Sequence, residues 1–216
     1  MGRFVSPKQK VMVVYGGTFD PFHRGHEAIC HAILQYSFVQ QLRLIPCHIP
    51  PLKDEATASS EQRLDMLRLW QDGQARSVVV DDIELQRDGP SYTMDTLGIL
   101  LNQNPGTQII LAMGADAWQS LPQWHGYSEL QQWVNIWVFD RQGSQLPPLQ
   151  GWTRVTGCKQ LIDISSGHYF VDQRVRMDVS STVLRDGTES LRAHVPEAIF
   201  RYIQENNLYL EMHQSL

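Results

Sequence analysis

Short apolar runs and amphipathic helical segments alternate along this chain of 216 residues. Runs of strand length are predicted at residues 11–15, 42–46, 77–81, 108–113 and 134–139. Helical spacing of apolar residues predicts helices at 27–38, 62–70, 93–101 and 196–205. Strands that alternate with helices are typical of a mostly parallel, doubly wound sheet. We therefore predict an α/β, Rossmann-like fold with helices on both faces of the sheet, formed by a single domain over residues 1–216 whose C-terminal helical portion spans about 180–210.

Residues 16–26, GGTFDPFHRGH, follow the first predicted strand directly and lead into the first predicted helix. Ligands of a doubly wound sheet bind beyond the carboxyl ends of its strands, where this segment lies. A glycine pair there lets the backbone turn tightly and brings its N–H groups close to a ligand. His23 and His26 share one face of the helix start, beside the positive end of the helix dipole. The segment predicts a polyphosphate site, although two histidines at a helix start could instead serve only as caps or packing groups.

Residues 180–185, SSTVLR, form a second segment with phosphate-binding chemistry. A serine or threonine before a helical turn caps the helix and leaves further N–H groups for an anion. Arg185 lies four residues after Ser181, so it could reach the same helix end and clamp phosphate oxygens. An ordinary capped helix start is the alternative interpretation.

Composition narrows the class of partner. The net charge of -5 and the absence of a Lys/Arg run argue against nucleic acid as the main partner. No stretch approaches the roughly 18 apolar residues of a membrane span, so no membrane partner is expected. The cysteines Cys30, Cys47 and Cys158 form no CxxC pair, and the histidines show no ligand spacing, so we predict reduced thiols and no protein-bound metal. We expect a cytoplasmic protein and leave a homo-oligomer open.

Together, the two phosphate segments resemble the GGTFDPxHxGH and ISSTxxR motifs of the nucleotidyltransferase superfamily. The resemblance implies adenylyl transfer from ATP, with Mg²⁺ arriving alongside the phosphates. It implies a catalytic role for His23, His26 and Arg185, with His23 as the principal donor to the α-phosphate in the transition state. The implied ATP-binding residues are Gly16, Gly17, Thr18, Phe19, His23, Gly25, His26, Ser180, Ser181, Thr182 and Arg185.

Further segments resemble those of the nicotinate-nucleotide adenylyltransferases. They are PSYTMDTL at 90–97, GAD at 114–116, LPQW at 121–124 and the C-terminal VP, YI and LY pairs. Trp124 would stack on the pyridine ring, and backbone N–H groups around Thr93 and His125 would bind the nicotinate carboxylate. Asp116 would accept from ribose hydroxyls or assist the metal, unless it only caps the next helix. The implied acceptor-binding residues are Lys53, Tyr92, Thr93, Asp116, Trp124 and His125.

The reaction implied by this resemblance joins nicotinate mononucleotide and ATP into nicotinate adenine dinucleotide and pyrophosphate, a step of NAD biosynthesis. A phosphate nucleophile is already ionised near neutral pH, so no general base is required. Two alternatives remain open. One is the same chemistry on nicotinamide mononucleotide or phosphopantetheine, and the other is a nucleotide-binding regulator without turnover. The resemblance covers most of the chain except roughly 141–175, where the pattern is only generically α/β.

Overall fold

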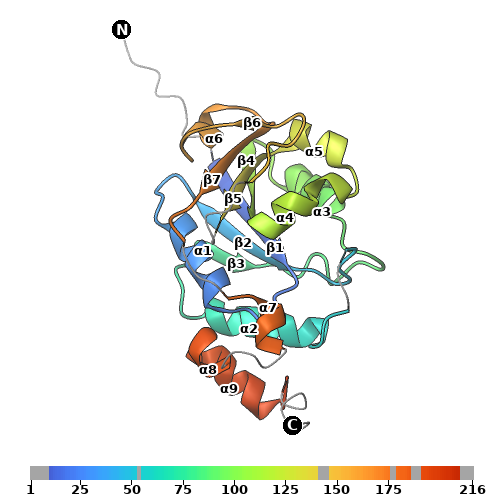
Figure 1. The fold of residues 1–216 in the computed structure, drawn as a ribbon, viewed down its shortest axis with the longest axis vertical. Coiled ribbons are helices and arrows are strands. Elements are labelled where there is room, and N and C mark those ends of the chain that lie inside the picture. The colour runs from blue at the N-terminus through green and yellow to red at the C-terminus, as the bar shows by residue number, and fades with distance from the viewer. Residues whose placement is uncertain (1–9, 53–54, 141–145, 176–178, 186–190, 210–216) are drawn as a thin grey trace.

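The computed structural model of the chain describes residues 10–52, 55–140, 146–175, 179–185 and 191–209, built around one sheet (Figure 1). Within these residues the strand order is β3-β2-β1-β4-β5-β7-β6, and all neighbouring strands pair in parallel. The strands are β1 (Lys10–Gly17), β2 (Gln41–Pro46), β3 (Val78–Val80), β4 (Thr107–Gly114), β5 (Asn135–Phe139), β6 (Thr153–Arg154) and β7 (His168–Asp172). The predicted α/β, Rossmann-like sheet is confirmed.

The strand order reverses between β1 and β4. From β1 the chain continues through β2 and β3 to one edge of the sheet, and from β4 it continues through β5 toward the other edge. Ligands of open α/β sheets bind at such a point, outside the carboxyl ends of the strands. Here those ends are Gly17 of β1 and Gly114 of β4, so the glycine-histidine segment emerges at the switch point.

Helices cover both faces of the sheet, as predicted (Figure 1). Residues of β1 alternate between the two faces, because successive side chains of a strand point in opposite directions. Val11, Val13 and Tyr15 belong to one hydrophobic core, and Met12 and Val14 belong to the other. The first core is covered by α1 (Arg24–Leu34), α2 (Ser60–Gln71), α6 (Gln160–Asp163), α7 (Ser181–Arg185), α8 (Leu191–His194) and α9 (Glu197–Glu205). The second is covered by α3 (Thr93–Gln103), α4 (Ala115–Ser120), the 3-10 helix η1 (Leu121–Gln123) and α5 (Tyr127–Trp133).

The region after β5 contains more regular structure than its sequence indicates. Residues 146–152 form no helix or strand, but β6, α6 and β7 follow them and extend the sheet. At the amino end of the sheet, the Asn135 side chain donates to the carbonyls of Leu161 and Ile164 at 2.7 and 2.9 Å. Its carbonyl oxygen accepts from the His168 backbone N–H at 2.9 Å, so one buried amide ties α6 and β7 to β5. Among the described residues, no helix is long and apolar enough to cross a membrane.

Candidate active site

The glycine pair lies inside β1 rather than in a turn, contrary to our expectation. Gly16 pairs with Ile45 and Gly17 with Pro46 of β2. The left-handed residue is Phe19, with φ of 52°. A Cβ on Gly17 would lie 3.0 Å from the Phe19 ring, whereas a Cβ on Gly16 would meet only a carbonyl oxygen at 3.8 Å. Gly17 is therefore needed for packing of Phe19, and the exposed Gly16 leaves its backbone open to close approach by a ligand.

His23 and His26 form a capping box at the start of α1. The Nδ1 atom of His23 accepts from the backbone N–H groups of Gly25 and His26 at 3.1 and 3.4 Å. In return, His26 Nδ1 accepts from the His23 backbone N–H at 3.3 Å. A ring nitrogen that accepts a hydrogen bond carries no proton, so both neutral rings are assigned the tautomer with the proton on Nε2. The three-residue spacing thus makes both imidazoles Nε2–H donors.

Aromatic side chains hold the two histidine rings in place. The His23 and His26 rings stack with centroids 3.7 Å apart. His26 also stacks on Phe22 at 5.5 Å and meets the edge of Phe19 at 5.1 Å. His23 is 1% exposed, while His26 is partly exposed. Because these rings are fixed and largely out of water before a ligand arrives, their N–H groups are preorganised donors.

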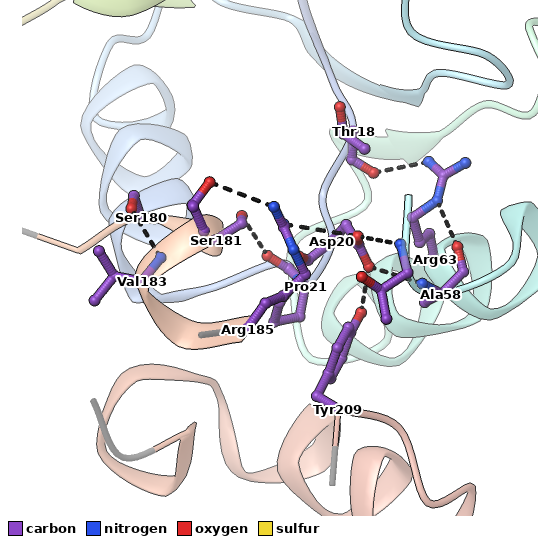
Figure 2. A network of polar contacts seen from close by, with 12 residues as sticks. Thr18, Asp20, Pro21, Ala58, Arg63, Ser180, Ser181, Val183, Arg185 and Tyr209 are labelled. Carbon is purple, nitrogen blue, oxygen red and sulfur yellow. Dashed lines mark hydrogen bonds and ion pairs between the residues drawn. The ribbon is translucent and has the colours of Figure 1, made fainter. Parts of the chain in front are cut away.

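The structure brings the second predicted phosphate segment onto the first (Figure 2). The Ser181 hydroxyl donates to the Pro21 carbonyl at 3.1 Å. The Arg185 guanidinium donates to the Asp20 carbonyl at 2.7 Å and to the Thr182 hydroxyl at 3.3 Å. Ser180 accepts from the Val183 N–H at 3.3 Å and so caps α7, as its position in the sequence predicts. Segments about 160 residues apart in sequence therefore form one surface.

Asp20 is a buried residue of the site that the sequence prediction did not assign. It is 1% exposed, and its carboxylate accepts from the backbone N–H groups of Thr57 and Ala58 at 2.7 and 3.1 Å. The same carboxylate accepts from the hydroxyl of Tyr209 at 2.6 Å and lies 3.7 Å from Arg185 (Figure 2). A charged residue between the aromatic Phe19 and Phe22 is the feature of the sequence that could have identified it.

Arg63 is a second buried ionic residue that sequence reasoning missed. It lies on α2, is 1% exposed, and donates to the Thr18 carbonyl at 2.8 Å. It also donates to the carbonyls of Ala58 and His48, both at 3.3 Å. The partners are neutral oxygens on three different segments, so this cation holds the loop after β1 against the loops that follow β2 and precede α2. The position of Arg63 on the buried face of the predicted helix was the available indication.

The predicted acceptor residues gather on the other side of the sheet, except for Lys53, which lies outside the described residues. The Tyr92 and His125 rings lie 4.5 Å apart, and Thr93 begins α3, whose N-terminus has no side-chain cap hydrogen bond. Trp124 follows η1, is partly buried, and packs against the second core. Asp116 lies in the first turn of α4, with its carboxylate folded back over Gly114 at the end of β4.

A shallow cleft of about 370 Å³ lies beside these residues, between α3 and α5. His125 is the predicted acceptor residue that it includes. Two carboxylates in its wall, those of Asp95 and Glu129, disfavour binding of the highly charged polyphosphate of ATP there. Its lining is Met94, Asp95, Gly98, His125, Gly126, Glu129 and Trp133. We therefore place the ATP polyphosphate at the strand ends and not in this cleft. In the part of the chain that the structure describes, no three His, Cys, Asp or Glu side chains gather to hold a metal ion.

Comparison with known proteins shows the family and the fold of this chain. Residues 14–187 match the family model described as cytidylyltransferase-like. The chain is 31% identical over 209 residues to the "Probable nicotinate-nucleotide adenylyltransferase" of Idiomarina loihiensis, covering 93% of this chain and 100% of the relative. It is 35% identical over 203 residues to the protein of the same name from Aeromonas salmonicida, covering 90% and 94%. A solved structure of Plasmodium falciparum nicotinic acid mononucleotide adenylyltransferase complexed with NaAD superimposes with a TM-score of 0.73 at 16% identity, covering 93% of this chain and 97% of that one, which supports the fold.

Proposed function

Because the chain belongs to the nicotinate-nucleotide adenylyltransferases of the cytidylyltransferase-like family, we propose that it transfers the adenylyl group of ATP to nicotinate mononucleotide in NAD biosynthesis. A 5′-phosphate oxygen of the mononucleotide attacks the α-phosphorus of ATP and forms a new P–O bond. The bond from the α-phosphorus to the bridging oxygen breaks, and pyrophosphate leaves with that electron pair. No proton has to move, so the protein's task is alignment and charge neutralisation.

The observation that carries this proposal is the contact between residues 16–26 and residues 180–185 at the strand switch point. In our proposal, the polyphosphate of ATP lies over Gly16 and the start of α1. His23 Nε2–H donates to the α-phosphate as charge develops on it, and His26 supports the neighbouring phosphates. Arg185 supplies a fixed positive charge, because its bond to the Asp20 carbonyl sets the plane of the guanidinium. Ser180, Ser181 and Thr182 place α7 against the same phosphates.

Acceptor recognition follows from the uncapped start of α3. Backbone N–H groups around Thr93 and His125 would receive the nicotinate carboxylate, since helix N-termini favour anions. The carboxamide of nicotinamide would place an NH₂ donor against those donors, which disfavours it. Trp124 would stack on the pyridine ring and Asp116 would accept from ribose hydroxyls. Lys53 would add a cation to the phosphates.

The metal ion belongs to the substrate in this scheme. Since the described residues offer no cluster of ligands, we propose that Mg²⁺ enters as the ATP complex, held mainly by phosphate oxygens. The ion neutralises phosphate charge when bound. We also place the reaction in the cytoplasm, because Cys30, Cys47 and Cys158 are free thiols, as is usual in a reducing compartment.

Pyrophosphate release with each acceptor offered separately tests the proposed function. We expect turnover with ATP and nicotinate mononucleotide, and much less with nicotinamide mononucleotide or phosphopantetheine. Equal or greater turnover with the amide would refute the carboxylate argument. ATP binding without pyrophosphate release from any of the three acceptors would favour a nucleotide-binding regulator.

A further inference from the structure

We propose that Tyr209, in the C-terminal segment, is a positioning residue for ATP that acts through Asp20. It holds in place Arg185 and the loop between β1 and α1, residues 18–23, which we call the phosphate loop. Nothing in the motifs of the sequence assigns it such a role. The inference rests on the proposed adenylyl transfer, because it concerns how the ATP half of that site is held.

Asp20 joins four segments of the chain at one point (Figure 2). Its carboxylate is bound by the backbone before α2 through Thr57 and Ala58, and by the hydroxyl of Tyr209. Its main-chain carbonyl accepts from Arg185. A side chain held by three donors has little freedom to rotate, so the carbonyl of the same residue is held as well. Tyr209 is therefore connected to Arg185 through one residue, Asp20.

The C-terminal segment adopts a strained backbone conformation where it places Tyr209. After α9 the chain turns, with Asn207 and Tyr209 both at positive φ, 52° and 60°. For a bulky residue this backbone region is strained. The Tyr209 ring is 4% exposed and packs in the first core, and its hydroxyl makes a buried bond to a carboxylate. Those two interactions offset the backbone strain and fix the phenol beneath the phosphate loop.

The phenol remains a donor over the working range of pH. Burial raises the pKa of Tyr209 far above its usual value, and the charge of Asp20 raises it further. The hydroxyl proton is therefore retained and stays available for the hydrogen bond to Asp20. Because charge-assisted hydrogen bonds are about twice as strong as neutral ones, this contact is well suited to fixing a loop.

Substitution Tyr209→Phe isolates the hydroxyl, since the ring and its packing are kept. We expect KM for ATP to rise and kcat to fall, so that kcat/KM for ATP drops about tenfold. KM for nicotinate mononucleotide should stay within about twofold, because Trp124 packs against the second core whereas Phe19 and Phe22, on either side of Asp20, belong to the first. An equal fall in kcat/KM for the two substrates, or no fall in kcat/KM for ATP, would overturn the proposal.

Tyr202→Phe is the matched control. Tyr202 lies on α9 and donates to the Asp65 carboxylate on α2 at 3.1 Å. The Tyr202→Phe substitution therefore also removes one hydrogen bond between a phenol and a carboxylate. That bond does not involve the phosphate loop. We expect Tyr202→Phe to lower the melting temperature while leaving the kinetics for both substrates at the wild-type values. Equal kinetic effects of the two substitutions would mean that Tyr209 acts only through general stability.

A double-mutant cycle with Asp20→Asn tests whether Tyr209 acts through Asp20. If it does, the combined variant loses less kcat/KM for ATP than the product of the single losses. Fully multiplicative losses would contradict the proposed route. Turnover by the wild-type protein tests the function itself. If the wild type shows no turnover, the proposed adenylyl transfer is wrong. If the wild type turns over and the Tyr209→Phe enzyme has the same kinetics, only the role of Tyr209 is wrong.

Discussion

Replacing His23 by asparagine or by alanine separates its two roles, since asparagine is a good N-cap and alanine is not. In the structure, His23 Nδ1 accepts from two backbone N–H groups and its ring is almost fully buried. The alanine variant loses both the cap and the buried ring, whereas the asparagine variant keeps an oxygen for the cap. The lost cap is worth about 1 kcal/mol. For a protein of this size, His23→Asn should therefore melt roughly 2–4 °C above His23→Ala.

The kinetics should not follow that order of stability. Neither side chain can replace an Nε2–H donor at the α-phosphate, so both variants should lose about 10²–10³-fold in kcat, the range seen when one preorganised donor is removed. ATP binding should change little, because the donor acts mainly in the transition state. Steady-state pyrophosphate release, ATP titration and thermal unfolding on both variants provide the comparison. If asparagine restored kcat along with stability, His23 would be only a helix cap.

Three further perturbations have expected outcomes. Gly17→Ala should lose about 1–2 kcal/mol of stability, because the new Cβ overpacks against the Phe19 ring. Gly16→Ala should unfold like the wild type. If the two alanine variants have the same midpoint of urea unfolding, the packing argument is wrong. Trp124→Ala should raise KM for nicotinate mononucleotide about tenfold, the loss expected for one stacked base, and leave KM for ATP unchanged; a shift in the ATP value alone would place Trp124 elsewhere. Burial alone would raise the pKa of Asp172, but hydrogen bonds from Arg174 outweigh it and lower the pKa. Its contribution to stability is present above the unfolded value and is lost as pH falls through the folded value, so Asp172→Asn should lower the melting temperature at pH ~7, and by progressively less as pH falls below ~4. A pH-independent difference would show that charge is not involved.

The strands around the site could be predicted because they are buried on both faces. Parallel strands covered by helices appear in sequence as short continuous apolar runs, and β1, β4 and β5 have this form, whereas Arg43 interrupts the run of β2. β7, with the sequence HYFVD, begins and ends on polar residues and lacks such a run. Its place in the sheet depends on contacts with β5 and with the Asn135 side chain, which local pattern does not encode.

The histidines were predictable as a pair but not in their geometry. Spacing alone indicates one shared face, and both a cap and a phosphate site require that. The structure shows that the cap itself determines the tautomer, because backbone N–H groups occupy Nδ1 of both rings. Capping through Nδ1 and phosphate binding through Nε2 are therefore compatible. The sequence pattern presented them as alternatives because it does not show which ring nitrogen makes the cap.

Asp20 shows why the roles within a motif cannot be assigned by position along the chain. In residues 16–26 a carboxylate and two imidazoles are all polar groups beside an expected phosphate, and sequence gives no reason to turn one of them inward. Asp20 is turned inward because its partners come from Thr57, Ala58 and Tyr209, the last of them 189 residues away. A carboxylate directed at the phosphates would repel them. The Asp20 carboxylate is directed into the protein instead, where it lies 3.7 Å from Arg185, and the same guanidinium donates to the Asp20 main-chain carbonyl. The negative charge in the motif thus fixes the loop, and its burial keeps that charge away from the ATP that the loop is proposed to bind.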